Sequence, residues 1–419
     1  MPFRVLVVCS KPPFPSVDGG TRAIAELVAG LAGQGHAVHV LALATRKHPD
    51  LRGVPPAGVV QETIAVDDAR ALSGLSSLWP SRAHPGSELP FSVARFLSPR
   101  FARRLGQLLE EEAPDVVQFE GLHVAPYQRL AHDAGARVVV RAHNVDADLW
   151  RQRARTSRWP LSSWLGMQAE RVERLEVGYW RSAHAVAAIS PAVARACSAA
   201  TAAPVIDLPV GLAVPPQPPP ITDPSRLFHI GAMDWAPTAD GITWFLADVW
   251  PRILAKQPSA VFHLAGRRVA QFAAGHRAPN VVWDGEVADA DAYVRGGGVL
   301  IAPVRTGSGV RVKIIEAMAQ GRAIVTTSAG AEGLDCVSDQ HLLVADDAAG
   351  LAEQVLRCLA SPALVRGLGA AAHRLAATRF DRDVLTTRLV RLYVSLVSAS
   401  QSGQRAASRT VNAPDVARA

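Results

Sequence analysis

Short apolar runs alternate with helical patterns along the first half of the chain. The first run, Arg4–Ser10, is followed by a proline- and glycine-containing loop at Lys11–Gly20, an amphipathic helical pattern at Thr21–Gln34 and a second apolar run at Ala37–Leu43. Four further strand candidates follow at Asp115–Phe119, Arg137–Ala142, Ala185–Ile189 and Val205–Leu208. Strands that alternate with helices predict a parallel sheet with helices on both faces.

The same alternation restarts after a proline-rich segment, Pro209–Pro224. Its closely spaced prolines exclude a helix or a central strand and predict a stiff connector. Beyond it, helices are predicted at Ala239–Lys256 and Val310–Gln320. Strands are predicted at Leu227–Ile230, Ala260–Leu264, Val281–Trp283, Val299–Ala302, Ala323–Thr327 and Leu342–Val344. The second half of the chain is therefore a second α/β unit.

These patterns predict two α/β domains. Residues 1–208 form the first, 209–224 the linker and 225–385 the second. An amphipathic helix is predicted at 386–398, and the small, polar residues 399–419 are expected to form a disordered tail. Ligands of open parallel sheets bind at the carboxyl ends of the strands, so we expect one deep cleft between the two domains.

Composition places the chain among ordinary globular proteins. Of its 419 residues, 49% are apolar and 19% are charged, and no apolar run is long enough to suggest a membrane span or a signal peptide. We therefore expect a cytoplasmic protein. Four widely spaced cysteines predict neither a disulfide framework nor a structural zinc site. A net charge of +7 favours anionic partners, such as nucleotides, phospholipid headgroups or nucleic acid, without choosing among them.

The segment Ala302–Gly321 carries the most chemical information. A predicted strand leads through a Gly-Ser-Gly turn into a helix, and small residues at a helix N-terminus let backbone N–H groups approach an anion. Arg305, Arg311 and Lys313 place three cations around this turn, which suits a diphosphate. Glu316 is positioned to accept hydrogen bonds from sugar or ribose hydroxyls. A tight turn with solvated basic residues is the alternative interpretation.

Two common nucleotide-binding motifs are excluded. The turn is not a dinucleotide fingerprint, because Val312 stands where the third glycine is expected. No GxxxxGK[ST] sequence occurs in the chain, so a P-loop kinase is disfavoured as well.

Three blocks of the sequence, in family order, resemble GT-B glycosyltransferases of the group 1, or family 4, retaining type. They are Val17–Leu43, Phe228–Phe245 and the segment GSGVRVKIIEAMAQGRAIVTTSAGAEGL. The resemblance implies two Rossmann-like domains facing each other across a cleft, with the acceptor on the first and a nucleotide diphosphate sugar on the second. It further implies that the C-terminal helix at 386–398 packs back on the first domain. It also implies transfer of the sugar to an acceptor hydroxyl with retention, in glycan, polysaccharide, glycolipid or glycosylated metabolite synthesis.

The resemblance also implies roles for individual residues. The second member of the family's glutamate pair falls on Glu316, which in relatives binds the donor ribose, and the first falls on Ser308, which brings no carboxylate. An arginine and a lysine that many relatives carry near Gly231–Trp235 have no counterpart here, so their role passes to the three cations of the glycine-rich turn. The loops of Thr45–Pro99 are expected to select the acceptor.

The site is thereby assigned in two groups. The catalytic residues implied are His143, Arg305, Lys313 and Glu316. The donor-binding residues implied are Gly19, Gly20, Gly231, Trp235, Gly307, Ser308, Gly309, Val310, Arg311, Glu332 and Gly333. Structural alternatives are a helix cap for Gly19 and Gly20, packing for Trp235 and an ordinary loop position for His143.

Cofactors and partners follow from the same residues. Because cationic side chains face the diphosphate, no obligatory metal or other cofactor is expected beyond the nucleotide sugar donor. Two arginine clusters, Arg95–Arg104 and Arg151–Arg158, flank apolar residues. They fit either peripheral contact with the inner face of a membrane or solvated helix faces with long side chains. Nothing suggests the basic stripe with aromatic platforms that nucleic acid binding needs.

Two other functions are weighed against glycosyl transfer. A nucleotide-sugar epimerase of the same fold would need acidic groups in the cleft, such as Glu120 and Asp146 buried together. A non-catalytic GT-B scaffold is favoured by Ser308 in place of the family glutamate and opposed by Lys313 and Glu316.

Overall fold

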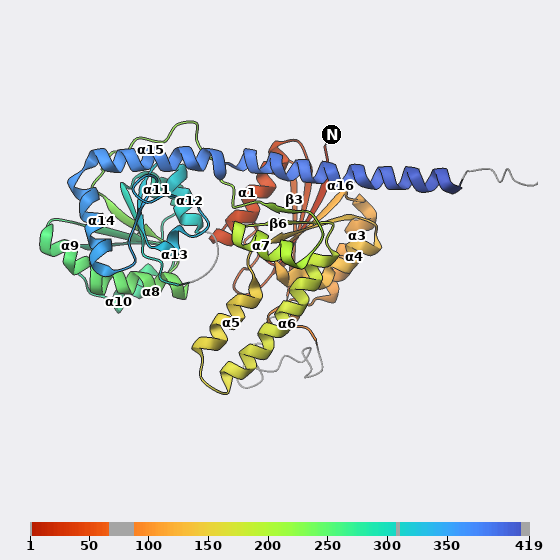
Figure 1. Ribbon diagram of the computed structural model, residues 1–419, viewed down its shortest axis with the longest axis horizontal. Coiled ribbons are helices and arrows are strands. Elements are labelled where there is room, and N and C mark those ends of the chain that lie inside the picture. The colour runs from red at the N-terminus through yellow and green to blue at the C-terminus, as the bar shows by residue number, and fades with distance from the viewer. Residues whose placement is uncertain (1, 67–87, 307–310, 412–419) are drawn as a thin grey trace, which may run out of the picture. The chain divides into compact units, whose positions relative to one another are not determined.

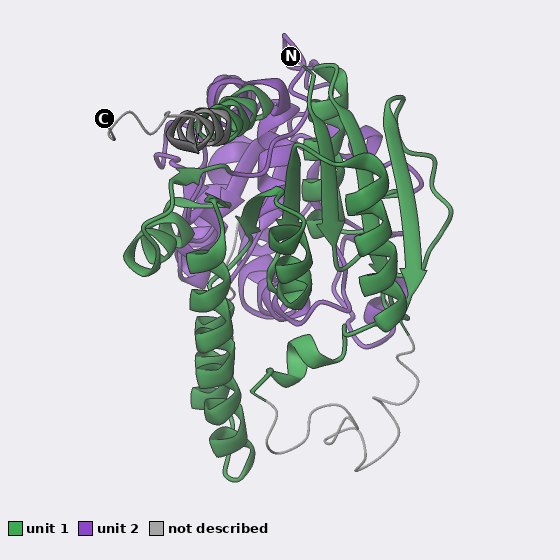
Figure 2. Cartoon of the chain, turned by 90° about the vertical axis from the view of Figure 1, so that its right-hand side faces the viewer, with its two compact units in different colours: residues 1–208, 386–419 green, residues 209–385 purple. Residues whose placement is uncertain are grey.

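The two hydrophobic alternations of the sequence form two parallel sheets. The computed structural model describes residues 2–66, 88–306 and 311–411, and the side chains as far as residue 399. The chain divides into two units, one made of Met1–Leu208 with Thr386–Ala419 and one of Pro209–Leu385 (Figures 1 and 2). The predicted α/β class with two parallel sheets is confirmed.

The sheet of the first unit has seven strands in the order β3-β2-β1-β4-β5-β6-β7, and all its pairs are parallel. The strands are β1 (Arg4–Cys9), β2 (Ala37–Ala44), β3 (Val59–Ala65), β4 (Val116–Glu120), β5 (Arg137–Ala142), β6 (Ala185–Ala188) and β7 (Val205–Asp207). Strands β1, β4 and β5 are buried almost throughout because helices cover both faces. The strand order reverses at β1, so the carboxyl ends of β1 and β4 flank the switch point at which such sheets bind ligands.

The first unit has eight helical segments before residue 208 in the described part of the chain. They are α1 (Gly19–Gly33), α2 (Phe91–Ala94), α3 (Pro99–Glu112), η3 (Leu122–Tyr127), α4 (Gln128–Asp133), α5 (Asp146–Thr156), α6 (Leu161–Ser182) and α7 (Pro191–Ala200). Helix α1 begins at a capping box: the Thr21 N–H donates to Asp18 Oδ1 at 2.8 Å, and Thr21 Oγ1 accepts from the Asp18 N–H at 2.9 Å.

Strand β3 lies inside Thr45–Pro99, which the sequence analysis assigns to loops, so that assignment is wrong for this part. The segment reads VVQETIA, and most of its side chains are only partly buried at the edge of the sheet. Its polar residues are used there: Glu62 pairs with Arg104 of α3 at 2.7 Å, and Gln61 bonds the Phe14 backbone. An edge strand of this kind lacks the apolar run by which the inner strands are recognised.

The sheet of the second unit has six strands in the order β10-β9-β8-β11-β12-β13, again all parallel. The strands are β8 (Leu227–Ile230), β9 (Phe262–Ala265), β10 (Val281–Gly285), β11 (Val299–Ala302), β12 (Ala323–Thr326) and β13 (Leu343–Val344). The order reverses at β8, which places the carboxyl ends of β8 and β11 at the switch point of this sheet.

The helices of this unit are α8 (Ala236–Trp244), η4 (Phe245–Val249), α9 (Trp250–Lys256), α10 (Val269–Ala274), α11 (Ala290–Arg295), α12 (Val312–Ala319), α13 (Ser328–Ala331), α14 (Ala348–Ala360) and α15 (Pro362–Arg379). The single helix predicted over Ala239–Lys256 is divided by the π-helical turn η4. Pro251 has no N–H to continue an α-helical ladder, which explains the widened turn before it. Among the described helices none alone is long and apolar enough to cross a bilayer, whereas the sharply bent pair α14–α15 reaches that length and apolarity when taken together.

The proline-rich segment is part of the second unit rather than a free connector. The fully buried guanidinium of Arg322 donates to the backbone oxygens of Pro219 and Pro220. It also donates to those of Arg295 at 3.1 Å and Gly297 at 3.2 Å. One arginine therefore fixes the linker against the sheet.

The last helix, α16 (Arg382–Val411), begins in the second unit and continues in the first. Within the first unit its Tyr393 packs edge-on against Phe3 and donates a hydrogen bond to Gln118. The sequence pattern predicts the end of this helix at residue 398 and a disordered tail from 399. The helix instead continues to Val411, because alanine, glutamine and arginine extend a helix readily, and 412–419 lie outside the described residues.

Candidate active site

A lysine lies where β8, β11 and the start of α12 meet. Lys313 is the second residue of α12, and its Nζ lies 3.3 Å from His229 Nε2. His229 lies on β8, and its Nδ1 is 2.8 Å from the carbonyl oxygen of Ile301 on β11. Because a carbonyl only accepts, Nδ1 carries the imidazole proton and Nε2 accepts from the Lys313 ammonium.

The electrostatics of this cluster favour an anionic ligand. Burial lowers the pKa of Lys313 to about 8; the charge of Glu316 opposes this shift and that of Arg311 adds to it. Burial, and then the Lys313 charge, hold the pKa of His229 well below its ordinary value, so this ring is neutral. The Lys313 ammonium is thus desolvated and hydrogen-bonded to a neutral ring, a state that a phosphate oxygen would stabilise.

Gly231, directly after β8, makes room for the lysine. A Cβ at this position would lie 2.6 Å from Lys313 Nζ and 2.9 Å from His229 Nε2. Only glycine leaves space for the cluster at this backbone position.

Gly231→Ala is therefore expected to displace the Lys313 ammonium and to weaken binding of a nucleoside diphosphate about tenfold. Isothermal calorimetry measures the affinity. Gly367→Ala is the matched control, because a Cβ on this glycine of α15 meets no atom within 4 Å. Equal affinity in wild type and Gly231→Ala would show that Lys313 tolerates the displacement.

The other two cations of the turn already face acidic groups. Arg305 Nη1 lies 3.7 Å from Asp240 Oδ2, and its guanidinium lies over the Trp244 ring at 5.4 Å. Arg311 precedes α12 as its N-cap; burial lowers its pKa, and the charge of Glu332 opposes this. The predicted donor-binding residues Gly307, Ser308, Gly309 and Val310 lie outside the described residues.

The remaining predicted residues of this unit lie in segments that follow strands β8, β11 and β12, at the carboxyl edge of the sheet. Trp235 caps α8 and is 56% exposed. Glu332 and Gly333 follow α13, and Gly333 has a φ of 75°, a left-handed conformation that suits glycine. Glu316 lies on α12 close enough to Lys313 to influence its pKa.

The first unit contains a histidine–glutamate pair at the ends of two neighbouring strands. His143 follows β5 and Glu120 ends β4, and His143 Nε2 lies 2.6 Å from Glu120 Oε2. Glu120 is fully buried, and Arg141 Nη1 lies 3.8 Å from the same oxygen. Gln118 Nε2 donates to the other carboxylate oxygen, and Gln118 in turn accepts from the hydroxyl of Tyr393 on α16.

These contacts keep Glu120 ionised. Burial would raise the pKa of its carboxyl, but Arg141, His143 and Gln118 together hold this pKa below its ordinary value. A fixed, buried carboxylate orients the imidazole and selects its tautomer. The sequence pattern indicates His143 and places Glu120 at the same sheet edge, but it does not predict that the two side chains pair.

Two carboxyl groups, those of Asp146 and Glu176, lie together at the start of α5. Glu176 of α6 accepts the backbone N–H of Asp146 at 2.8 Å and that of Ala147 at 3.3 Å, so it caps the helix from outside. Burial raises the pKa of Asp146 to about 6, and burial together with the Asp146 charge raises the pKa of Glu176 to about 8. Asp146 is thus coupled to Glu176, and Glu120 to His143, rather than to each other as an epimerase would favour.

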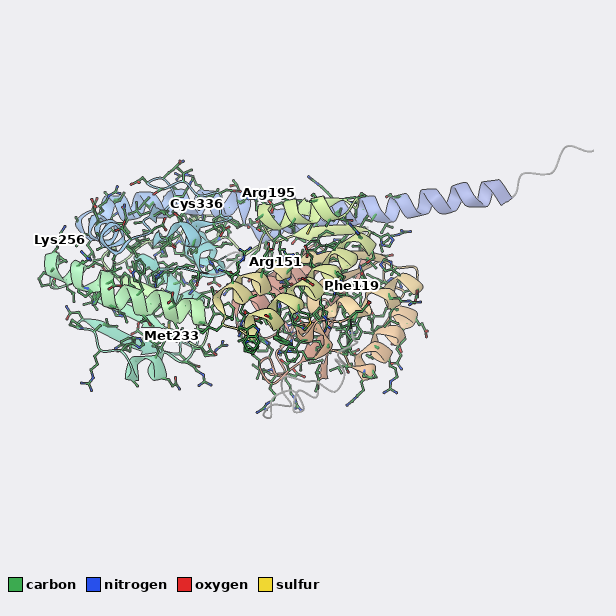
Figure 3. All side chains as sticks on the ribbon, turned by 60° about the horizontal axis from the view of Figure 1, so that its bottom comes forward. Phe119, Arg151, Arg195, Met233, Lys256 and Cys336 are labelled. Carbon is green, nitrogen blue, oxygen red and sulfur yellow. The ribbon has the colours of Figure 1, made fainter. Side chains whose placement is uncertain are left out.

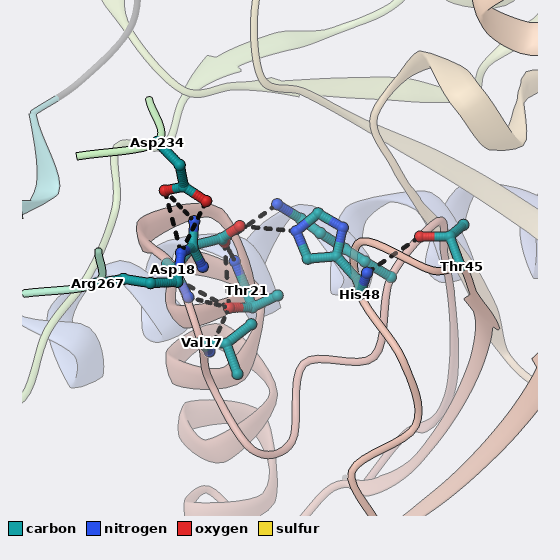
Figure 4. Close-up of polar contacts among 8 residues, drawn as sticks. Val17, Asp18, Thr21, Thr45, His48, Asp234 and Arg267 are labelled. Atoms are coloured by element: carbon teal, nitrogen blue, oxygen red, sulfur yellow. Dashed lines mark hydrogen bonds and ion pairs between the residues drawn. The ribbon is translucent and has the colours of Figure 1, made fainter. Parts of the chain in front are cut away.

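The loop after β1 holds another cation that sequence reasoning misses. Lys11 Nζ lies 3.3 Å from Asp18 Oδ1. His48 Nε2 lies 2.8 Å from the other oxygen of the same carboxylate (Figure 4). Burial would raise the pKa of Asp18, but His48 and Lys11 hold it far below its ordinary value. Gly19 and Gly20 open α1, and a Cβ on Gly20 would lie 2.3 Å from Lys11 Nζ. The two glycines therefore serve the helix start and the placement of Lys11.

Family models match both units. Residues 17–205 match Glycosyltransferase Family 4, and residues 224–361 match Glycosyl transferases group 1. The chain belongs to these group 1 and family 4 glycosyltransferases, which are enzymes of the glycosyl-transferring class, and the predicted family is confirmed.

Solved structures with the GT-B fold resemble the chain over nearly its whole length. Sucrose-phosphate synthase from Thermosynechococcus elongatus has a TM-score of 0.68 at 17% identity and covers 94% of this chain and 100% of that one. HepE of Anabaena in complex with UDP has a TM-score of 0.61 at 15% identity, covering 94% and 100%. WaaG, a glycosyltransferase involved in lipopolysaccharide biosynthesis, has a TM-score of 0.63 at 15% identity, covering 93% and 99%. These likenesses establish the GT-B fold.

A curated relative extends the comparison at the level of sequence. An uncharacterized 44.6 kDa protein in the cps region of Klebsiella pneumoniae is 23% identical over 140 residues, or 31% of this chain. The match spans 36% of the length of that relative.

Proposed function

We propose that this glycosyltransferase moves a sugar from a nucleotide diphosphate donor to an acceptor hydroxyl, with retention of configuration and without an obligatory metal. The observation that carries the proposal is the desolvated Lys313 ammonium on neutral His229 at the start of α12, with Gly231 leaving the space it needs. A cation held in this way at a helix N-terminus matches the two negative phosphates of such a donor.

The chemical difficulty of the reaction is the negative charge that grows on the departing diphosphate. Lys313 and the positive end of the α12 dipole are placed to stabilise that charge, and one such donor contributes roughly 3–4 kcal/mol to lowering a barrier. In a front-face retaining reaction the leaving phosphate oxygen takes the acceptor proton, so no separate general base is required. Glu316 is assigned to the ribose hydroxyls, and His143, held by Glu120, to the position of the donor sugar or the acceptor.

The donor and the pathway are proposed from the relatives. HepE of Anabaena was crystallised with UDP and with UDP-glucose, so a UDP-sugar is the first donor to test. WaaG acts in lipopolysaccharide biosynthesis, and the Klebsiella relative is encoded in a cps region. We accordingly assign the chain to polysaccharide or glycolipid assembly at the cytoplasmic face of a membrane.

Binding and turnover together test this function. Calorimetry with UDP, GDP, ADP and dTDP, each with and without a chelator, is expected to give micromolar binding of one nucleotide that the chelator leaves unchanged. The matching nucleotide sugar is then expected to be hydrolysed slowly without acceptor. Formation of an isomeric nucleotide sugar instead would identify an epimerase, and binding without any turnover would identify a scaffold.

Affinity for the preferred diphosphate is expected to fall as the pH rises above about 8. Burial lowers the pKa of Lys313 to about 8, and a bound diphosphate favours the ammonium, so binding above this pH takes up a proton. The affinity then drops by up to about tenfold per pH unit, whereas below pH 8 Lys313 is already charged and contributes no slope. Calorimetry in buffers of different ionisation enthalpy measures the proton uptake. Lys313→Met is the control, and a wild-type curve parallel to that of Lys313→Met would exclude Lys313 as the titrating group.

A further inference from the structure

Helices α5 and α6 form a long hairpin that extends from the first unit (Figure 1). The two helices pack against each other through Trp150 and Trp164, whose rings lie 6.1 Å apart, and through Arg151, which is 2.5 Å from Glu173. Phe91 of α2 holds the same face of α6, with its ring 5.9 Å from that of Trp164. The hairpin is therefore held together by packing of its own.

Large apolar side chains gather on the exposed tip, defined here as residues 153–167. Trp159 in the connection is 81% exposed, Leu161 at the start of α6 is 48% exposed and Met167 is 42% exposed. Single exposed apolar residues are ordinary on protein surfaces, but a tryptophan and its apolar neighbours gathered at one projecting end mark a contact surface. Tryptophan is favoured where an apolar medium meets water.

The charge of the tip has one sign. No acidic residue occurs between Asp148 and Glu170. Arg151 lies on α5 and is labelled in Figure 3. Its charge is neutralised by Asp148 at 2.8 Å and by Glu173. In contrast, Arg153, Arg155 and Arg158 are exposed and take part in no ion pair among the residues that the structure describes.

We propose that the hairpin tip docks on the surface of an anionic lipid bilayer. Trp159 and Leu161 enter the interface between headgroups and acyl chains, and Arg153, Arg155 and Arg158 bind the lipid phosphates. Apolar anchors beside uncompensated arginines are the combination that such an interface binds, because burial of apolar area and attraction to anionic headgroups add. This docking rests on the proposed function and deepens it, because it names the surface by which the enzyme would reach a membrane and acceptors carried by a lipid.

Co-sedimentation of the whole chain with vesicles tests the proposal. Vesicles of phosphatidylcholine mixed with phosphatidylglycerol are expected to bind the protein at least about tenfold more tightly than phosphatidylcholine alone, and added salt is expected to weaken this binding. Equal binding to both kinds of vesicle, or no binding to either, would overturn the proposal.

Matched variants locate the contact on the hairpin. Arg155→Glu with Arg158→Glu is expected to weaken vesicle binding roughly thirtyfold or more, whereas Arg100→Glu with Arg103→Glu, the same charge change on exposed positions of α3, changes it much less. Trp159→Ser is expected to weaken it about tenfold, and Val54→Ser, at a 92% exposed position, is its control. Equal losses in the variants and their controls would contradict a docking site at the tip.

The result is separable from the proposed function. Calorimetric binding of a nucleoside diphosphate, measured without vesicles, is expected to be the same in wild type and in all four variants. Loss of diphosphate binding in a hairpin variant would point to damage to the fold, and that variant would then be replaced by Arg155→Gln with Arg158→Gln, for which weakened vesicle binding is again required.

Discussion

Lys313→Met is expected to lower kcat/KM for the nucleotide sugar about a hundred- to a thousandfold and to weaken binding of the nucleoside diphosphate, with the remaining affinity still measurable by calorimetry. Methionine keeps most of the side-chain volume but removes the ammonium beside His229, which belongs to the second residue of the helix whose N-terminus we assign to the diphosphate. The loss is expected to be larger in kcat than in donor affinity, because the charge on the leaving diphosphate is greatest in the transition state.

The control is Lys256→Met at the exposed end of α9 (Figure 3). It removes the same charge from the same unit and is expected to leave both kcat and affinity within about twofold of wild type. Because removal of the charge also relieves its desolvation, Lys313→Met is expected to melt no lower than the wild type. A variant that melts normally and still turns over at the wild-type rate would remove Lys313 from the mechanism.

Glu120→Gln is expected to lower kcat about ten- to a hundredfold while leaving the affinity for nucleoside diphosphate unchanged. The substitution keeps the shape of the side chain but removes the buried charge that lies 2.6 Å from His143 Nε2. The imidazole then loses its fixed orientation, whereas the Lys313 cluster belongs to the other unit. Steady-state kinetics and calorimetry on the same preparation separate the two effects.

This substitution also removes a carboxylate from the buried Arg141, so a loss of stability is expected alongside the loss of rate. Glu112→Gln provides a matched comparison, because Glu112 pairs with His39 at the same distance of 2.6 Å in the same unit. It is expected to affect the melting temperature only. If kcat falls equally in Glu112→Gln and Glu120→Gln, the effect is one of stability, and Glu120 does not position His143 for the reaction.

Much of the fold is encoded locally and could be predicted. The apolar runs of β1, β2, β4 and β5 report burial on both faces of a parallel sheet, and their order with the helices determines the class. The glycine-rich turn before α12 likewise showed which helix N-terminus carries Lys313. The edge strand β3 and the extension of α16 were missed, because neither shows a strong apolar period of its own.

The same distinction applies to the candidate site, of which one part follows from the local sequence and another only from the tertiary structure. The sequence by itself determined the two α/β units, the family and the chemistry-bearing residues at strand and helix ends, such as His143 and Lys313, because these follow from local pattern and motif. Only the tertiary structure decided their partners. His229 meets Lys313 across 84 residues, and Tyr393 reaches the Gln118–Glu120–His143 network across 275 residues. Such contacts depend on strand order and helix packing, which bring distant residues together at one sheet edge and leave no local trace in the sequence.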